Sequence, residues 1–517
     1  MTESRLSKGF LNARINLFFY IVFVFLSFFS RKIFLDSLGA DFMGLSGTLS
    51  SILGFLSLAE MGIGSAVSYN LYKPLSEGNK QRIEDLVSVF GFLYRKIGLF
   101  IMSIGMIISL FIPLVFKNTI FNYFLILFAF YCILTSSLLS YFINYKQIVL
   151  SADQKGYVVT GYLQGAGFVK TLLQMFFAYY WGNFYIWIIL ELLFSFLACL
   201  ILNWKIKKTY PWLNASVKKG KQCFRNYHYI IGFTKKVFIH KIKDFLLSQS
   251  DQILVFAFVS LKMVAFYGNY TLVITRVSSA FNSALNSIGA SVGNLVAEGN
   301  KSKSVGVFWE LVSLRFIFAG ILIFSVYNLI EPFIELWLGK EYVMDHLILV
   351  LLLINVAIVQ TRGAVDMFNF AFGHFADTWA AWCELVINIG VTLISAPFLG
   401  IVGILLGKIA STIVIIIFWK PYYLFKVGFR LKYKDYWKKE IVYLLILLAC
   451  LIICTELCRL IPVEAASSYI NWLKKAFLST SLFFITYLTS LYLLTDGTKS
   501  LLKRLCIFIK NKKIHNP

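Results

Sequence analysis

The sequence predicts an all-α polytopic membrane protein with about 14 transmembrane helices. Fourteen separate stretches are each long and apolar enough to cross a bilayer. The composition agrees, because 59% of the 517 residues are hydrophobic and only 14% are charged, whereas about a quarter of the residues in soluble proteins are charged. Several stretches carry an isolated charge near mid-span, where facing lipid would cost roughly 2.5–3.5 kcal/mol. Such charges indicate a wet cavity or buried pairs inside a bundle, and a bundle of this kind without an enzyme motif suggests a transporter.

Each predicted span reaches the roughly 20 residues that a ~30 Å hydrocarbon core requires at about 1.5 Å per residue. The first is an uncleaved helix rather than a secretory signal, because Ser30-Arg31-Lys32 stands where a cleavage site would need small residues. The seventh is the weakest, since several ionisable residues between His240 and Asp251 interrupt it. In chain order the spans are 11–34, 44–72, 86–116, 120–145, 154–180, 184–204, 237–261, 267–297, 305–330, 347–372, 376–397, 400–419, 439–461 and 473–495.

Lysine and arginine gather on one side of this topology. The net charge is +24, and the densest clusters are Lys205–Lys243, Lys420–Lys439 and Lys499–Lys513. All three lie on the same side as the N-terminus, which is the positive-inside pattern, so both termini are predicted to be cytoplasmic. We interpret the clusters as topology determinants that touch anionic headgroups rather than as nucleic-acid sites.

An internal repeat predicts two equivalent halves of six spans each. The segment Ile63-Gly64-Ser65-Ala66-Val67 followed by Glu77-Gly78-Asn79-Lys80 resembles Ile288-Gly289-Ala290-Ser291-Val292 followed by Glu298-Gly299-Asn300-Lys301. Two unrelated small-residue helix ends are the alternative. The expected division is an N-terminal lobe over 1–204, a basic cytoplasmic linker over 205–236, a C-terminal lobe over 237–419, and spans 13 and 14 with a basic cytoplasmic tail over 420–517.

Motifs for catalysis or metal binding are missing from the sequence. Gly403 to Lys408 is one residue short of a Walker A spacing and lies in an apolar helix, where its glycines favour close helix packing. No GxSxG or HExxH occurs. Cys450, Cys454 and Cys458 share one helix face, which small packing residues explain better than a metal site. We therefore expect no catalytic residue, no metal and no cofactor.

Polar stripes at helical spacing are the candidate functional features. The tenth span carries one such stripe, the eighth another from Arg276 to Asn286, and the fifth places Lys170 and Gln174 one turn apart. The stripe in the tenth span consists of Asn355, Arg362, Asp366 and Asn369. If these faces point inward, the cations form a positive lumen. Its members are Lys170, Arg276, Arg315, Arg362 and Lys408.

Structural roles compete with this interpretation. Arg362 and Asp366 are four residues apart and could form an ion pair that only specifies packing, and Arg276 lies close enough to a span end to snorkel. The acidic residues could couple transport to an ion or could neutralise nearby cations. These acidic candidates are Glu60, Asp244, Asp251 and Asp366.

Two segments of the chain resemble a known family. Leu38–Leu45, Ser57–Ala66 and Tyr72–Leu75 are similar to the first helices of bacterial polysaccharide flippases, which belong to the multidrug/oligosaccharidyl-lipid/polysaccharide exporter superfamily. Ser250–Ile253 through Tyr267–Tyr270 resembles the start of that family's second half. Together with the fourteen-span layout, the resemblance covers most of the chain.

The resemblance implies two lobes, spans 1–6 and 7–12, that face each other across a central cavity opening alternately to either side. It implies an undecaprenyl diphosphate-linked oligosaccharide as substrate, such as a repeat unit of O-antigen, capsule or exopolysaccharide. It further implies a bacterial cytoplasmic membrane location, contact with membrane lipids, and a polysaccharide polymerase and chain-length machinery as partners. We expect no nucleic-acid partner.

The residues agree with this chemistry, because a cationic lumen would offset the desolvation of a diphosphate. The sugars would contact polar residues on the same faces, for which the candidates are Gln174, Asn286, Asn355 and Asn369. We therefore predict a flippase that carries the lipid-linked oligosaccharide from the inner to the outer leaflet. The alternatives are a multidrug cation exporter of the same superfamily and a membrane-embedded polysaccharide polymerase or ligase.

Overall fold

In a computed structural model of the chain, residues 5–56, 63–117, 119–227, 250–286, 288–373 and 378–514 are described. Within these ranges the chain forms helices and turns and no strand, so the all-α prediction is confirmed. The chain divides into two compact units, Met1–Ala265 and Phe266–Pro517. Ten of the described helices are long and apolar enough to cross a membrane, and the chain is therefore a multi-pass membrane protein.

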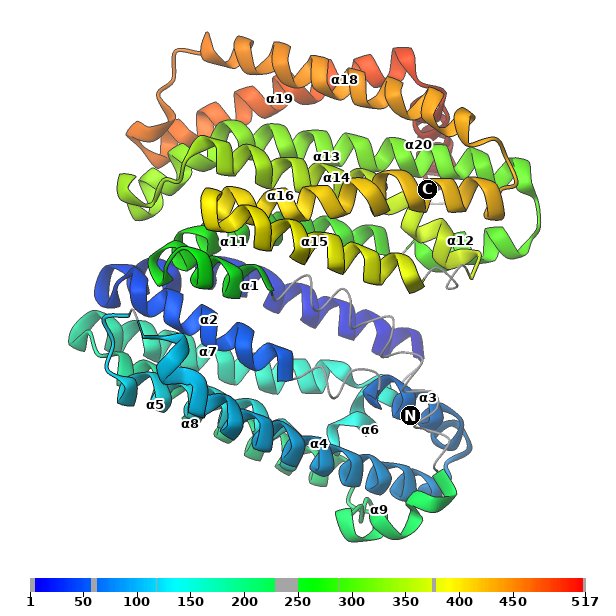
Figure 1. The fold of residues 1–517 in the computed structure, drawn as a ribbon. Helices are drawn as coiled ribbons and strands as arrows, with labels where there is room; N and C mark the ends of the chain where they lie inside the picture. Colours follow the sequence, from blue (N-terminus) through cyan, green and yellow to red (C-terminus); the bar gives the residue numbers. More distant parts are fainter. Residues whose placement is uncertain are drawn as a thin grey trace. The chain divides into compact units, whose positions relative to one another are not determined.

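The first unit is built from long apolar helices joined by short connections (Figure 1). Residues 250–258 are also helical, and α11 begins at the end of this unit. The helices are α1 (Arg5–Leu38), α2 (Ala40–Leu56), α3 (Ile63–Glu77), α4 (Lys80–Val115), α5 (Tyr123–Phe142), α6 (Gln147–Ala152), α7 (Gly156–Trp181), α8 (Phe184–Thr209), α9 (Val217–Cys223) and a 3-10 turn at Phe224–Tyr227.

The second unit holds the remaining long helices and two π-helical segments, Ile413–Trp419 and Leu424–Gly428, on either side of α17. Short 3-10 turns lie at Lys340–Tyr342 and Ala465–Ser467. The helices are α11 (Leu261–Asn286), α12 (Gly289–Ala297), α13 (Lys301–Leu338), α14 (His346–Ala371), α15 (Thr378–Leu399), α16 (Ile401–Thr412), α17 (Lys420–Tyr423), α18 (Tyr433–Arg459), α19 (Tyr469–Leu494) and α20 (Asp496–Ile514).

The two repeated segments adopt the same local structure. Gly78 and Gly299 have φ values of +66° and +72°, a left-handed conformation that favours glycine. The next residue caps the following long helix in each case: Asn79 accepts from the backbone N–H of Arg82, and Asn300 from that of Lys303, both at 3.0 Å. Thus α3 and α4 in the first unit correspond to α12 and α13 in the second.

Each unit also contains a helical hairpin that turns at a glycine with positive φ. Gly182 joins α7 to α8 at φ +55°, and Gly400 joins α15 to α16 at φ +56°. Glycines also allow the second of these hairpins to close tightly. Gly403 and Gly407 lie against the backbone of α15, where a Cβ would overlap backbone atoms of Ser395 and Asn388. The prediction that these two glycines serve helix packing is therefore confirmed.

The unit boundary falls at Ala265 rather than before residue 237, where the expected C-terminal lobe begins. The reason is packing around α2. Gly44 lies directly against the carbonyl of Leu261, and Ser51 donates to Gln252 at 3.1 Å. Residues 250–265 are therefore held by the first unit.

The last three helices are integral to the second unit (Figure 1). The hydroxyl of Tyr487 on α19 donates to the carbonyl of Phe316 on α13 at 3.1 Å, and the rings of Phe324 and Phe483 stack at 4.2 Å. At the start of α20, a Cβ on Gly497 would overlap atoms of α13 and α18. Buried contacts therefore bind α18, α19 and α20 to α13.

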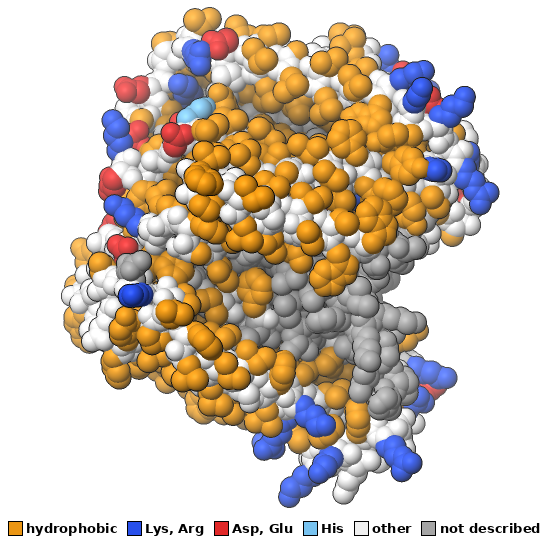
Figure 2. All heavy atoms as spheres, viewed as in Figure 1, with side chains coloured by type: hydrophobic (Ala, Val, Ile, Leu, Met, Phe, Trp, Pro, Cys, Tyr) orange, Lys and Arg blue, Asp and Glu red, His pale blue; other side chains and the backbone are white. Residues whose placement is uncertain are grey.

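Hydrophobic side chains cover the middle of the visible face of each unit, while charged side chains gather toward helix ends (Figure 2). Leu110, Phe398 and Leu460 are among the large apolar residues left more than three-quarters exposed. A soluble surface would not leave such side chains in water, whereas a bilayer replaces water with hydrocarbon. The surface pattern thus agrees with a bundle that lies in a membrane.

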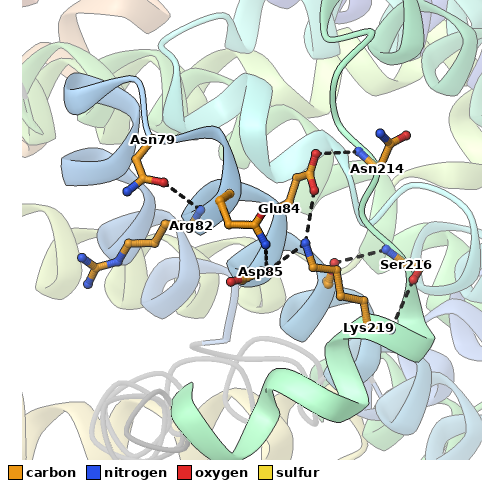
Figure 3. A network of polar contacts seen from close by, with 9 residues as sticks. Asn79, Arg82, Glu84, Asp85, Asn214, Ser216 and Lys219 are labelled. Atoms are coloured by element: carbon orange, nitrogen blue, oxygen red, sulfur yellow. Dashed lines mark hydrogen bonds and ion pairs between the residues drawn. The ribbon is translucent and has the colours of Figure 1, made fainter.

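The short helix α9, which follows α8, is attached to the start of α4 by polar contacts (Figure 3). We call this contact between α9 and α4 the clip. Lys219 on α9 binds Glu84 at 3.1 Å and Asp85 at 2.9 Å, and Ser216 caps α9 while its backbone N–H donates to Ser88. Burial lowers the pKa of Lys219, but the hydrogen bonds to the two carboxylates outweigh this effect and raise the pKa above its ordinary value. Lys219 therefore stabilises the contact between α9 and α4 throughout the neutral pH range. This stabilisation is lost only as the pH rises through the raised pKa of Lys219.

We expect Gly220→Leu to open this clip, because a Cβ at Gly220 would overlap the carbonyl of Ser88. Overpacking of about 1–2 kcal/mol would raise the open fraction by roughly 5- to 30-fold. Trypsin should then cleave faster at the exposed Lys218 and Lys221, measured by limited proteolysis of the full chain. Gly161→Leu is the control, since nothing lies within 4 Å of a Cβ there. Equal cleavage rates for the two variants would contradict the clip.

Candidate functional site

A half-open cavity of about 830 Å³ lies in the second unit, among α11, α12, α13 and α14. Its wall combines apolar side chains with a small number of polar groups, as ligand sites commonly do. The lining residues are Asn282, Gly289, Gly293, Arg315, Val359, Gln360, Gly363, Asp366, Met367, Phe370 and Ala371.

Arg315 is the cationic group of this cavity. It projects from α13, a 38-residue helix, and its side chain is buried, with 7% exposed. Its Nη1 donates to Oδ1 of Asn282 on α11 at 2.7 Å. Gly363 lies directly against the guanidinium, where any side chain would collide with it. Among the described residues no carboxylate lies within ion-pair distance of Arg315, so a neutral amide is its partner.

Asp366 is the acidic group at the same cavity, and it is paired. Its carboxylate binds Nζ of Lys420 on α17 at 2.5 Å, and Asn369 donates to the carbonyl of Lys420 at 3.3 Å. The π-helical segments on both sides of α17 set the register of this stretch of chain. π-Helical turns are frequent at functional sites. Asp366 therefore has its direct ion pair with Lys420 and acts on Arg315 only through a longer-range electrostatic attraction.

Arg362 was predicted to belong to a cationic lumen, but it is not among the described residues that line this cavity. It is 2% exposed, and its Nη1 donates to Glu440 and to the hydroxyl of Tyr436, both on α18. The rings of Tyr436 and Trp437 lie near the guanidinium. Its ion-pair partner is therefore Glu440 and not Asp366, one turn along the same helix. The pairing of Arg362 with Asp366 that the spacing allowed is not what the structure shows.

Lys170 and Gln174 converge on one carboxylate in the first unit. Nζ of Lys170 binds Glu191 on α8 at 2.6 Å, and Nε2 of Gln174 donates to the other oxygen of Glu191 at 3.3 Å and to the carbonyl of Trp187 at 2.9 Å. The predicted shared face of α7 is thus present, and it binds Glu191, which was not among the predicted site residues.

The other candidates occupy separate places. Arg276 on α11 and Lys408 on α16 are half-buried in the second unit, and Asp251 is half-buried in the first unit; all three have interaction partners. Asn355 is buried on α14 and donates to the carbonyl of Leu351 at 3.1 Å. Three further candidates, Glu60, Asp244 and the side chain of Asn286, lie outside the described residues.

The structure therefore brings together Arg315 and Asp366, and separately Lys170 and Gln174, but does not gather all five cations around one cavity of a single unit. Three of the partners in these contacts were not predicted as site residues: Asn282, Glu191 and Glu440. Asn282 lies one position away from the stripe that the eighth span was predicted to carry. Glu191 lies within the sixth predicted span, where an isolated charge was itself the available signal. Glu440 follows Lys438 and Lys439 at the edge of the thirteenth span and gave no such signal.

The fold is similar to the folds of several solved membrane transporters. It is similar to the lipid II flippase MurJ in an inward closed conformation, with a TM-score of 0.64 over 93% of this chain and 99% of that chain, at 14% identity. It is also similar to an inward-facing multidrug resistance MATE family transporter, with a TM-score of 0.55 over 78% of this chain and 96% of the other, at 13% identity.

A third similar structure is a mutant form of the Vibrio cholerae MATE transporter VcmN, with a TM-score of 0.50 over 82% of this chain and 99% of the other, at 15% identity. No family model matches the chain. No curated protein matches it either. The sequence resemblance to the multidrug/oligosaccharidyl-lipid/polysaccharide exporter superfamily is therefore supported at the level of the fold.

Proposed function

We propose that this protein is a flippase for a polyprenyl diphosphate-linked oligosaccharide. It moves the substrate from the inner to the outer leaflet of the bacterial cytoplasmic membrane by alternating access, for the synthesis of a surface polysaccharide such as O-antigen. The fold shared with the lipid II flippase MurJ supports this class of substrate, and so does the resemblance of two segments to polysaccharide flippases.

The observation that carries the proposal is the buried Arg315 in the wall of the second unit's cavity. A buried guanidinium that no described carboxylate pairs with is costly, and an anionic ligand compensates that cost. Guanidinium groups bind phosphate oxygens through two parallel hydrogen bonds. Because Asn282 occupies only part of the donor set of Arg315, donors remain for a diphosphate.

A multidrug cation exporter is the second candidate function, because MATE transporters share the fold. Asp366 supplies a carboxylate at the cavity that a cationic drug could approach. The ion pair between Asp366 and Lys420 and the buried charge of Arg315 both work against this, since they leave the described lining without net negative charge. We therefore favour an anionic ligand.

Deletion of the gene distinguishes the two functions. A flippase deletion should remove surface polysaccharide and cause the lipid-linked oligosaccharide to accumulate, with no change in susceptibility to cationic drugs. Both quantities can be measured in the same strains, by extraction of polyprenyl-linked sugars and by growth in ethidium or a fluoroquinolone. Normal polysaccharide together with drug hypersensitivity would replace the flippase by the exporter.

The positive-inside pattern makes a separate prediction about topology. Reporter fusions after Lys219 and at Pro517 should both give cytoplasmic signals, because the opposite orientation would place three basic clusters on the translocated side. Alkaline phosphatase and a fluorescent protein that matures only in the cytoplasm are suitable paired reporters. A signal from the outer side at either position would contradict the predicted topology, in which both termini are cytoplasmic.

A further inference from the structure

A second, smaller cavity of about 220 Å³ lies within the first unit, among α5, α6, α7 and α8. It is separate from the cavity that holds Arg315, which belongs to the second unit. Its lining residues are Ser136, Ser140, Asn144, Gln147, Leu163, Gly167, Lys170, Phe194, Ser195, Ala198 and Cys199.

Three buried polar atoms in this lining make no hydrogen bond with any described residue: Oγ of Ser136, Oδ1 of Asn144 and Oε1 of Gln147. Asn144 is only 2% exposed. A buried polar atom without a partner costs about 1–3 kcal/mol, so three in one small cavity indicate an occupant that forms hydrogen bonds with them. An occupant with several hydroxyl groups meets this requirement, because a hydroxyl can donate to such oxygens and accept as well.

The cavity carries no net charge among its described residues. Its one charged member, Lys170, is paired with Glu191 at 2.6 Å. Phosphate or another anion would gain little from a cation already matched by a carboxylate, and its desolvation would remain uncompensated. The chemistry of this cavity therefore differs from that around Arg315, and it favours a neutral polar ligand.

The wall of this cavity has a polar part and an apolar part. Hydrogen-bonding groups come from Ser136 on α5, Asn144 in the connection between α5 and α6, and Gln147 on α6. Leu163 on α7 and Phe194 on α8 supply apolar surface. A sugar ring combines apolar C–H faces with hydroxyl groups at its edge and matches both parts. Water at ~30 Å³ per molecule could fill the volume, but it would match only the polar part.

We propose that this cavity in the first unit is a sugar site that accepts one neutral ring of the oligosaccharide. The inference rests on the proposed function, in which the diphosphate is bound by the cavity of the second unit. In this scheme Asn144 and Gln147 select for hydroxyl-bearing neutral rings, and Phe194 provides a stacking surface.

Saturation-transfer NMR on the purified full chain tests the proposal with free monosaccharides as probes: glucose, galactose, N-acetylglucosamine and glucuronate. At least one neutral sugar should give a signal in the native protein and exceed glucuronate. The double variant Asn144→Leu, Gln147→Leu should reduce this signal at least fivefold. Ala198→Leu, which leaves the polar atoms in place and fills the cavity, should do the same if the double variant fails to fold.

A matched pair of serines on α5 gives the control. Ser136→Ala removes a cavity hydroxyl that has no partner among the described residues, and should weaken the signal. Ser137→Ala removes a neighbouring hydroxyl that donates to the carbonyl of Leu134 outside the cavity lining, and should leave the signal unchanged.

No signal from any sugar would mean that the cavity holds water only and would overturn the proposal. A signal unchanged by Ala198→Leu, or one from glucuronate alone, would also overturn it. None of these results affects the proposed function, which is tested by the gene deletion and by substitution of Arg315. Loss of diphosphate-dependent transport with sugar binding intact would instead remove the proposed function.

Discussion

Replacing Arg362 by alanine should remove most of the folded protein from the membrane, and Glu440→Ala should do the same. Each substitution leaves one buried charge without its partner, since Arg362 and Glu440 have side-chain exposures of only 3% and 1%. Breaking a buried pair in this way costs about 3–5 kcal/mol. Membrane abundance and melting temperature of the purified variants measure the loss.

The paired substitution Arg362→Met, Glu440→Leu should restore both abundance and polysaccharide output. Hydrophobic residues of similar volume often replace a buried ion pair at little cost, and the coupling between the two positions is then read from the double-mutant cycle. A double variant that folds normally yet makes no polysaccharide would show that Arg362 contacts the substrate, as the sequence suggested. Recovery of polysaccharide would assign Arg362 and Glu440 to the packing of α18 on α14.

Arg315→Gln should lower flipping at least tenfold without lowering membrane abundance. Glutamine keeps a polar group next to Asn282 but removes the charge that we assign to the diphosphate, and a hydrogen bond to a charged group is worth about 1.5–3 kcal/mol. Arg315→Lys should retain part of the activity, because it preserves charge but loses the planar donor set. Surface polysaccharide and the amount of lipid-linked intermediate, each scaled to protein level, are the readouts.

Lys408→Gln is a useful comparison, because Lys408 is a half-buried cation of the second unit that is not among the described residues lining the cavity. It should reduce flipping less than Arg315→Gln. Full activity of Arg315→Gln at normal abundance would remove the phosphate role of this residue. A positive field from all five predicted cations would also be excluded if Gln at three or more of them left polymer output unchanged.

The sequence predicted the elements of the fold well because each span has to satisfy the same local requirement of length and apolarity. The repeat around Asn79 and Asn300 was visible because a left-handed glycine and a helix cap need particular residues. The turn at Ile288, which precedes α12 within the eighth predicted span, was not predicted. No proline or charge marks that turn, so periodicity alone continued the helix.

The candidate site was predicted less completely, because partners depend on tertiary packing. Arg315 was predicted to line a cationic lumen, and it lies in the wall of a cavity of the second unit; its role in substrate binding stays a prediction. Arg362 has the same chemical character and similar depth in its span, yet it faces α18 and binds Glu440. A stripe shows which residues share a face, but not which neighbouring helix that face meets. Glu440 also lies at the edge of its predicted span, where a charged residue does not indicate a buried ion pair.

Transbilayer movement of the lipid substrate is the most direct measurement of the central claim. The purified full chain is reconstituted into vesicles with radiolabelled undecaprenyl diphosphate-linked oligosaccharide extracted from the same cells, and an impermeant glycosidase or lectin reports the exposed leaflet. The native protein should move the lipid faster than protein-free vesicles, and Arg315→Gln should move it at least tenfold more slowly than the native protein. Movement no faster than in protein-free vesicles, together with transport of ethidium by the same preparation, would contradict the flippase.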